Sequence, residues 1–459
     1  LKNQPIAIQI STQPLRYDPE AIAQKFESNK IQVIKRWLEI LLPIISFAAQ
    51  WWWYRIIRLK PQIKHHHLAI KLRQHLTNLG TAYIKVGQAL STRPDLLPTA
   101  YLDELAKLQD ELPAFPTKIA HQFILEELGA TPDQIYAELT LEPVAAASLG
   151  QVYKGKLKTG ETVAVKVQRP DLAEKIALDM YILRGLTLWI EKRFSKIRSN
   201  LVAILDEFGA RLYEEMDYIQ EGNNAEKFAS LYSNITDVYV PKIYWQYTNR
   251  RVLTMEWIQG TKLTNLSEIQ TQGIDARHLV EVGIQCTLRQ LLEHGFFHAD
   301  PHPGNLLAME NGKLAYLDFG MMSYIEPYQR YALINALVHI VNRDFTALVQ
   351  DYVDLDFLPP DVDVTPVRGA LTKLFNDALI SNVAELNFQV IIQKLSELMY
   401  EHSFQVPAYY ALIIRALVAL EGIAMKIDPD FKILVSAYPY IAKRLLTDPA
   451  PELRTSLNN

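Results

Sequence analysis

The 459-residue sequence has one cysteine, Cys286, and no excess of charge of either sign. A single cysteine excludes an internal disulfide framework and is typical of a reducing compartment, where we expect it to be a small buried hydrophobe. The 47 basic and 51 acidic residues give a formal net charge of −4, so nucleic acid is not an expected partner. Repeats and low-complexity tracts are also lacking, which disfavours solenoid and disordered classes.

An unbroken apolar run long enough to span a membrane is lacking as well. The stretch at residues 38–57 is marginal for a spanning helix because Glu39, Pro43 and Gln50 interrupt it. Flanking cations and three consecutive tryptophans, Trp51–Trp53, suit the membrane–water interface. An amphipathic helix that packs on the protein's own core explains the pattern equally well, so both interpretations stay open.

Neither end of the sequence carries an obvious secretion or membrane signal. The chain begins with Leu1 and shows no secretory signal peptide, so we expect a processed chain or part of a longer protein. Near the other end, the apolar run that starts at Ala408 contains Arg415 and Glu421. Those charges favour a buried helix over a membrane span.

The length exceeds one ordinary hydrophobic core, so two or more lobes are expected. Alternating β-type runs stand between longer helical patterns, which predicts an α+β fold. Five regions follow: a polar arm with the Trp-rich segment, a helical extension, a small β-rich lobe with inserted helices, a helical lobe and a polar tail. Their residue ranges are 1–67, 68–139, 140–260, 261–446 and 447–459.

The segment HADPHPGN contains the residues that kinase-type phosphoryl transfer requires. That chemistry needs an aspartate that accepts the proton of the nucleophile and, five positions later, an asparagine that binds magnesium. Asp300 and Asn305 have this spacing, and His298 takes the first position of the H-x-D element. Thirteen residues further on, Asp318 opens an Asp-Phe-Gly tripeptide after a strand-like run. We therefore predict that Asn305 and Asp318 are Mg²⁺ ligands.

A phosphate-binding loop is predicted upstream, in the β-rich lobe. Its spacing matches G-x-G-x-x-G-x-V with alanine at the first two glycine positions, and it comprises Ala145, Ala146, Ala147, Ser148, Gly150 and Val152. Sixteen residues after Gly150, Lys166 ends a V-A-V-K run and matches the strand lysine that binds the α- and β-phosphates of ATP. Because a Cβ atom limits close backbone approach to phosphate, we expect weaker or altered nucleotide binding than in an ordinary kinase.

Lys166 needs an acidic partner, and EEMDYIQEGNNAEKF offers four: Glu214, Glu215, Asp217 and Glu221. On one continuous helix, the last two would share a face at i, i+4, while Glu215 would point elsewhere. One helix could then serve two partners. A solvated acidic face is the alternative reading of this segment.

An adenine-binding hinge is predicted at Met255, Glu256 and Trp257, because they follow a strand-like run in the order found in kinases. After Gly320 the chain runs almost directly into an amphipathic helix, with no A-P-E segment. The surface on which protein kinases seat a peptide is therefore expected to be absent.

Together these elements resemble the UbiB family of AarF-domain-containing atypical kinases, over at least residues 68–342. The family's K-x-G-Q element is matched by Lys85, Gly87 and Gln88, and the first and last of these could face one site at i, i+3. The resemblance implies an atypical kinase fold of two lobes, with a small β-rich N-lobe, a helical C-lobe and an N-terminal extension that folds over the active site.

The resemblance also implies specific pairings. Lys85 is expected to pair with the first acid of an E-x-D motif, which is matched here by Glu215 and Asp217. By the same likeness, Glu221 is the expected partner of Lys166.

Membership of this family implies an ATPase or kinase-like enzyme that uses ATP/ADP and Mg²⁺ and supports isoprenoid quinone or prenyl-lipid biosynthesis. Its expected partners are a nucleotide, membrane lipids, and prenylated quinone precursors or their enzymes. The expected location is a membrane surface on a reducing side, cytoplasmic or in an organellar matrix or stroma. A true protein kinase and a nucleotide-sensing scaffold without turnover are the alternatives.

Overall fold

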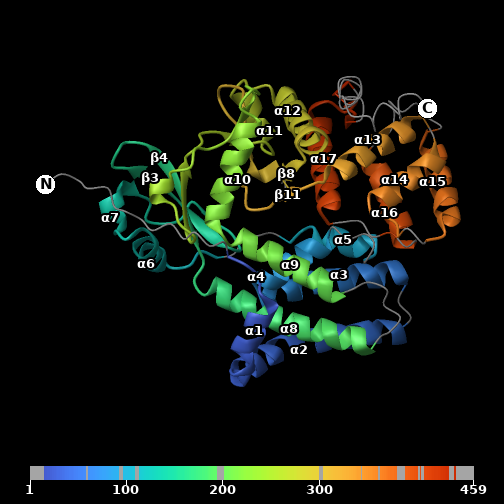
Figure 1. Ribbon diagram of the computed structural model, residues 1–459, viewed down its shortest axis with the longest axis horizontal. Helices are drawn as coiled ribbons and strands as arrows, with labels where there is room; N and C mark the ends of the chain where they lie inside the picture. The colour runs from blue at the N-terminus through green and yellow to red at the C-terminus, as the bar shows by residue number, and fades with distance from the viewer. Residues whose placement is uncertain are drawn as a thin grey trace. The chain divides into compact units, whose positions relative to one another are not determined.

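The protein's computed structural model describes residues 15–57, 60–91, 97–108, 113–193, 201–298, 303–342, 344–359, 362–379, 388–401, 404, 408–433 and 439–440. The chain divides into two compact units (Figure 1). The first comprises Leu1–Ser91, Asp103–Glu226 and Pro241–Trp257, and the second Thr92–Leu102, Lys227–Val240 and Ile258–Asn459. Two helices, α5 (Thr99–Leu105) and α10 (Tyr218–Leu231), contribute residues to both.

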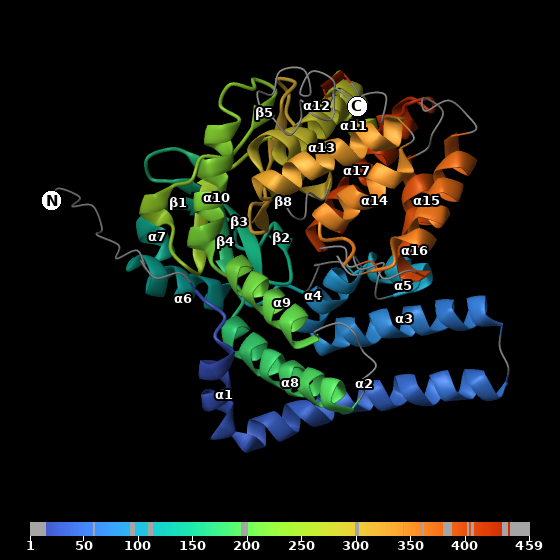
Figure 2. The same cartoon turned by 45° about the vertical axis from the view of Figure 1, so that its right-hand side comes forward.

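Within the described residues, six helices form the helical part of the first unit. They are α1 (Pro19–Glu27), α2 (Lys30–Ile56), α3 (Pro61–Leu79), α4 (Thr81–Leu90), α8 (Leu172–Arg193) and α9 (Leu201–Glu215). Figure 2 shows α2 and α3 side by side, with α8 also against α2. The 27 residues of α2 make a helix roughly 40 Å long.

The polar arm expected at the start of the chain contains an ordered helix, α1. The carboxylate of Asp18 caps this helix by accepting hydrogen bonds from two first-turn amide groups, at 3.0 Å each. Ile22 and Phe26 are buried on its inner face. A cap and two apolar anchors are enough to order a segment whose composition is mostly polar. Residues 1–14 lie outside the described part of the chain.

A five-stranded antiparallel sheet forms the β-rich part of the first unit. Its strands are β1 (Tyr136–Leu139), β2 (Ala145–Ala146), β3 (Gly150–Leu157), β4 (Thr162–Gln168) and β6 (Val252–Glu256), in the order β1-β3-β4-β6 with β2 on β3. In β4, Val163, Val165 and Val167 are fully buried in the core that α6 (Thr117–Leu128) helps to form. Alternation along the strand therefore points Lys166 to the other face.

Three short elements complete this unit: α7 (Pro132–Ile135), η1 (Trp245–Tyr247) and the first residues of α10.

The second unit has two small sheets and a set of helices. One sheet has the order β5 (Val238–Tyr239), β10 (Leu314–Tyr316), β9 (Leu306–Ala308) and β7 (Thr261–Lys262), and the other pairs β8 (Phe296–His298) with β11 (Met322–Tyr324). The helices are α11 (Leu266–Thr271), α12 (Ala276–Arg289), α13 (Pro327–Asn342), α14 (Phe345–Asp354), α15 (Val364–Leu379), α16 (Phe388–Glu401) and α17 (Ala408–Ile427). Two short turns, η2 (Gln290–His294) and η3 (Pro303–Asn305), precede β8 and β9.

The buried-helix prediction for the run from Ala408 is confirmed. Leu420, Ile423 and Ala424 of α17 are buried, and this helix packs on α12, where Cys286 is also buried. None of the helices in the described part of the chain combines the length and apolarity that crossing a membrane requires. The α+β class predicted from the sequence is confirmed.

Candidate functional site

The central ion pair of the first unit joins β4 to α10. The ammonium group of Lys166 lies 2.9 and 2.8 Å from the two carboxylate oxygens of Glu221. Only 3% of Glu221 is exposed. A charge buried to this degree needs an opposite charge and hydrogen bonds, and Lys166 supplies both. Of the four acids that the sequence offered, the structure brings this one to Lys166.

The acidic segment is not one helix, contrary to the geometry expected from its spacing. Helix α9 ends at Glu215 and α10 begins at Tyr218, so Asp217 lies in the turn between them. There its carboxylate accepts the amide hydrogen of Ile219 at 3.1 Å and caps α10. The turn is held to the sheet by Gln168, whose side-chain amide donates to the Met216 carbonyl at 2.8 Å.

Lys85 of α4 forms a second ion pair, with Glu215 at 2.5 Å. The side chains of Lys85 and Glu215 are 7% and 13% exposed, so the pair is largely shielded from solvent. The side-chain amide of Gln88 donates to the Leu108 carbonyl at 3.3 Å. A Cβ atom at Gly87 would overlap the Leu108 side chain and lie 2.8 Å from Leu76, so a larger residue there would require these side chains to shift.

Asp217 has partners that the sequence did not indicate. Its carboxylate accepts the amide hydrogen of Leu15 at 3.0 Å and lies 3.9 Å from the guanidinium of Arg250. The Arg250 carbonyl in turn accepts the amide hydrogen of Tyr218 at 3.2 Å. The turn is therefore fixed from three directions: the N-terminal segment, β4 and the chain that leads into β6.

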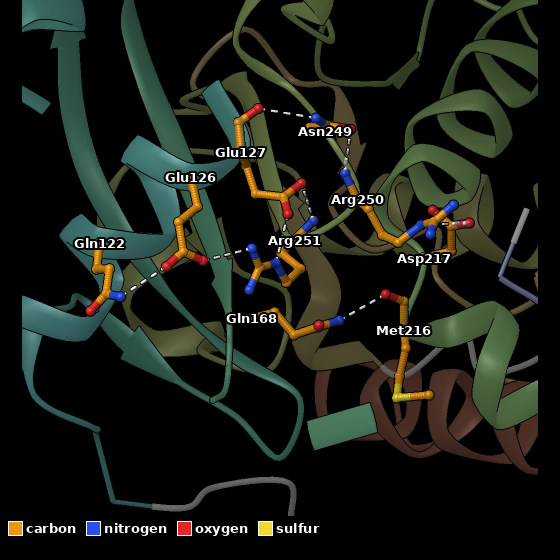
Figure 3. A network of polar contacts seen from close by, with 9 residues as sticks. All are labelled: Gln122, Glu126, Glu127, Gln168, Met216, Asp217, Asn249, Arg250 and Arg251. Atoms are coloured by element: carbon orange, nitrogen blue, oxygen red, sulfur yellow. Dashed lines mark hydrogen bonds and ion pairs between the residues drawn. The ribbon is translucent and has the colours of Figure 1, made fainter. Parts of the chain in front are cut away.

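Figure 3 shows the polar network that connects α6 with this turn. The guanidinium of Arg251 binds Glu127 at 2.6 Å and Glu126 at 2.8 Å, both at the end of α6. The side chain of Asn249 donates to the Glu127 carbonyl at 3.0 Å. These contacts anchor residues 249–251 and so the position of Arg250 beside Asp217. Adjacent arginines before a strand carry no motif, and nothing in the sequence alone could have placed them here.

The predicted phosphate loop is a tight bend between two paired strands. Ala145 and Ala146 pair with Val152 and Gln151 of β3, and the Ala147 amide donates to the Gly150 carbonyl at 2.8 Å. Positive φ values at non-glycine residues of the described chain occur at Asp171 and Asp356, so the alanines adopt ordinary backbone angles. The loop therefore does not use the conformation for which glycine would be required.

This loop is also held from outside. Ser148 is 1% exposed, and its carbonyl accepts the hydroxyl of Thr81, the first residue of α4, at 3.2 Å. The guanidinium of Arg169 donates to the Ala147 carbonyl at 2.8 Å. The helical extension and the residue that follows β4 thus fix the loop at two successive carbonyl groups.

The predicted hinge lies at the end of β6. The amide group of Glu256 donates to the Lys242 carbonyl at 2.8 Å, and that of Trp257 donates to the Thr162 carbonyl at 3.1 Å. Met255 lies opposite Ala164 in the β4–β6 register. The amides of Glu256 and Trp257 are thus engaged in backbone hydrogen bonds, and Met255 is paired within the sheet.

In the second unit, His298 positions the Asp-Phe-Gly segment. Its Nε2 atom donates to the Asp318 carbonyl at 2.6 Å, because a carbonyl oxygen only accepts. The His298 amide donates to the Gln290 side chain at 2.7 Å, and the histidine is 3% exposed. One oxygen of the Asp318 carboxylate accepts the Gly320 amide at 3.0 Å. The structure thus gives His298 a supporting contact with the Asp318 backbone.

Asn305 ends the short helix η3, and its carbonyl accepts the Leu317 amide at 3.1 Å, next to Asp318. Asp300 lies outside the described residues. Among the described residues, no group of three or more His, Cys, Asp or Glu side chains could hold a metal ion. Asn305 and Asp318 still fit Mg²⁺ chemically, since this ion prefers oxygen ligands and takes much of its coordination from waters and phosphates.

These features define the chain as a protein-kinase-like protein. More specifically, it belongs to the family of the ABC1 atypical kinase-like domain, whose model matches residues 107–352. The model of the UbiB helical domain matches residues 371–432. The family resemblance seen in the sequence is confirmed.

Several known proteins are similar to this chain. An uncharacterised protein of Synechocystis, sll0005, is 63% identical over 96% of the chain and 65% of its own length. The chloroplastic protein ACTIVITY OF BC1 COMPLEX KINASE 3 of Arabidopsis thaliana is 51% identical over 96% of the chain and 62% of its own length. The chain thus spans less than two thirds of each of these two relatives.

The solved structure of Rv3197 from Mycobacterium tuberculosis, in complex with erythromycin, is 22% identical. The match covers 77% of this chain and 90% of that one, with a TM-score of 0.52, and supports the fold.

Proposed function

We propose that this protein is an atypical ATPase or kinase-like enzyme that binds Mg-ATP and supports isoprenoid quinone or prenyl-lipid biosynthesis at a membrane. The observation that carries the proposal is the Lys166–Glu221 pair, in which the glutamate is buried. It fixes a lysine on the face of β4 opposite the core, in the arrangement with which kinases bind the α- and β-phosphates. Family membership supports the class of enzyme.

In this proposal, Lys166 binds the α- and β-phosphates beside the alanine-containing loop. Asn305 and Asp318 hold Mg²⁺, which neutralises charge on the phosphate oxygens when it is bound. Asp300 accepts the proton of the attacking hydroxyl or water. The oxygen of that nucleophile bonds to the γ-phosphorus as the bond to ADP breaks and ADP leaves. His298 keeps the Asp318 backbone in place through its hydrogen bond.

A small acceptor is favoured over a protein substrate. Strand β11 and helix α13 follow Gly320 within a few residues, with α13 beginning at Pro327. The chain has no segment there that would form a peptide platform. Lys85, buried against Glu215, serves in this proposal to restrict the site further.

The membrane role is assigned to α2, whose apolar side chains face outward. Ile40 is its buried residue, whereas Ile31 is 84% and Leu42 69% exposed. Trp51, Trp52 and Trp53 are also exposed. Cations accompany them, and the ammonium of Lys64 lies 4.7 Å from the centre of the Trp51 ring. Tryptophan with neighbouring cations suits the headgroup region of an anionic membrane, so a surface-bound helix is the better of the two interpretations.

Replacing Trp51–Trp53 together by alanine is expected to reduce flotation of the protein with anionic vesicles severalfold, because three interfacial anchors are lost. Leu141→Ala provides the matched control, since Leu141 is 84% exposed and lies outside the helix. Equal flotation of the tryptophan variant and the unaltered protein would remove α2 as the membrane element.

The proposed activity is tested by ATP hydrolysis in Mg²⁺ and in EDTA, with and without anionic vesicles that contain a prenyl-phenol. We expect turnover that requires Mg²⁺ and rises severalfold with the vesicles. Binding of ATP without any turnover under all four conditions would favour the scaffold alternative. Phosphorylation of an added peptide at a rate above hydrolysis would favour a protein kinase.

A further inference from the structure

Tyr218 lies at the start of α10, three residues before Glu221, and is completely buried. The ammonium of Lys166 lies over its ring, 5.0 Å from the centroid. Lys166 is therefore held by Glu221 and by the ring of Tyr218, both presented from the first turn of one helix. A ring face attracts a cation, and the attraction is strongest where water is excluded.

The other end of Tyr218 reaches the predicted phosphate loop. Its hydroxyl occupies the space that a Cβ atom on Gly150 would need, and that atom would also lie 2.6 Å from the Val167 carbonyl. Gly150 does not adopt a positive φ. The lack of space for a side chain, and not the backbone conformation, therefore explains why glycine stands at this position. A side chain at position 150 and the tyrosine at position 218 would therefore exclude each other sterically.

The backbone of Tyr218 is fixed as well. Its amide donates to the Arg250 carbonyl at 3.2 Å, and the preceding residue, Asp217, caps the helix. The Tyr218 side chain therefore packs against β3 and β4 from a backbone whose position is fixed. It connects the lysine, the glycine of the loop and the helix that carries Glu221.

We propose that Tyr218 is a positioning residue of the nucleotide site, whose ring orients the Lys166 ammonium and whose hydroxyl sets the end of the phosphate loop at Gly150. This inference rests on the proposed function for its effect on nucleotide affinity. The geometric part, the hold of the ring on Lys166, is independent of any nucleotide.

The ring is tested by acetylation of Lys166 in nucleotide-free protein, followed by mass spectrometry, with exposed Lys60 as the internal reference. Tyr218→Phe keeps the ring and is expected to leave the relative rate of Lys166 unchanged. Tyr218→Leu removes the aromatic face and is expected to raise it about fivefold. Phe228→Leu, at another buried aromatic residue of α10, is the control and should leave the rate unchanged.

The effect on the site is tested by ADP affinity in the same variants. Tyr218→Leu is expected to weaken binding about tenfold, and Tyr218→Phe about threefold because only the hydroxyl contact is lost.

Equal Lys166 acetylation in the Leu variant and the unaltered protein would overturn the inference. If no form binds ADP, the proposed function fails, while acetylation still decides the role of the ring. Unfolding of the Leu variant would leave the Phe variant to decide: unchanged ADP affinity there contradicts the hydroxyl's role.

Discussion

Asp318→Asn is expected to lower the rate of Mg²⁺-dependent ATP hydrolysis at least about 100-fold, or roughly 2.7 kcal/mol of transition-state stabilisation. The amide lacks the negative charge that binds Mg²⁺ beside the phosphates, so the loss is in catalysis. The fold should be unaffected. The Asn oxygen still accepts the Gly320 amide, and the contact with His298 involves the backbone carbonyl. Steady-state turnover and thermal unfolding of the purified variant check both parts.

The matched control is Asp344→Asn. Asp344 caps α14 by accepting the amide hydrogens of Thr346 and Ala347, and asparagine caps helices equally well. This variant should hydrolyse ATP at the normal rate. Equal turnover in the Asp318 variant and the unaltered protein would contradict a metal role for Asp318.

Arg36→Ala is expected to lower the free energy of unfolding by about 3 kcal/mol, because it leaves a buried carboxylate unpaired. The guanidinium of Arg36 binds Asp179 of α8 at 2.7 and 3.0 Å and donates to the Leu79 carbonyl at 2.7 Å. It also lies over the ring of Tyr83 in α4, 5.6 Å from the centroid. Four helices of the first unit therefore meet at this side chain. Urea-induced unfolding measures the change.

The size of this loss should depend on pH. Burial raises the pKa of Asp179, and Arg36 opposes that shift. Without Arg36 the folded-state pKa rises further above the unfolded value, so the folded protein takes up the proton more readily as the pH falls. The deficit of the variant should therefore shrink as the pH falls from neutral into the acidic range and Asp179 becomes neutral.

Arg184→Ala is the comparison for this prediction. Arg184 pairs with Asp206 between α8 and α9, but the two side chains are 33% and 28% exposed. Its loss should cost about 1 kcal/mol or less and show little change over the same pH range. Similar losses in both variants would show that the Arg36 junction is no stronger than a surface pair.

The sequence predicted most readily the residues whose chemistry depends on local spacing. Asp300, Asn305 and Asp318 stand at fixed distances in one stretch of chain, and the valine alternation around Lys166 predicts a strand. The α+β class and the family follow from such patterns, and both are confirmed. The metal and nucleotide roles of these residues remain proposals.

Contacts between distant segments were out of reach of the sequence alone. Lys85 and Glu215 are 130 positions apart, and their pairing was expected only through the family resemblance. The partners of Asp217 lie at Leu15 and Arg250, where no motif marks them. The break between α9 and α10 was missed because the acidic spacing suits a helix, while the capping role of Asp217 becomes apparent only in the fold.

The contact between Thr81 and Ser148 has a consequence for the thermodynamics of ligand binding. A loop that a nucleotide must order on arrival loses conformational entropy in the process, which weakens the complex. Here contacts within the protein, from Arg169 and Thr81, already hold the turn through the carbonyl groups of Ala147 and Ser148. Nucleotide association should therefore proceed with little ordering of the loop. The free energy of nucleotide binding would then reflect the phosphate contacts themselves. Removing the hydrogen bond between Thr81 of α4 and Ser148 would make the binding entropy more unfavourable.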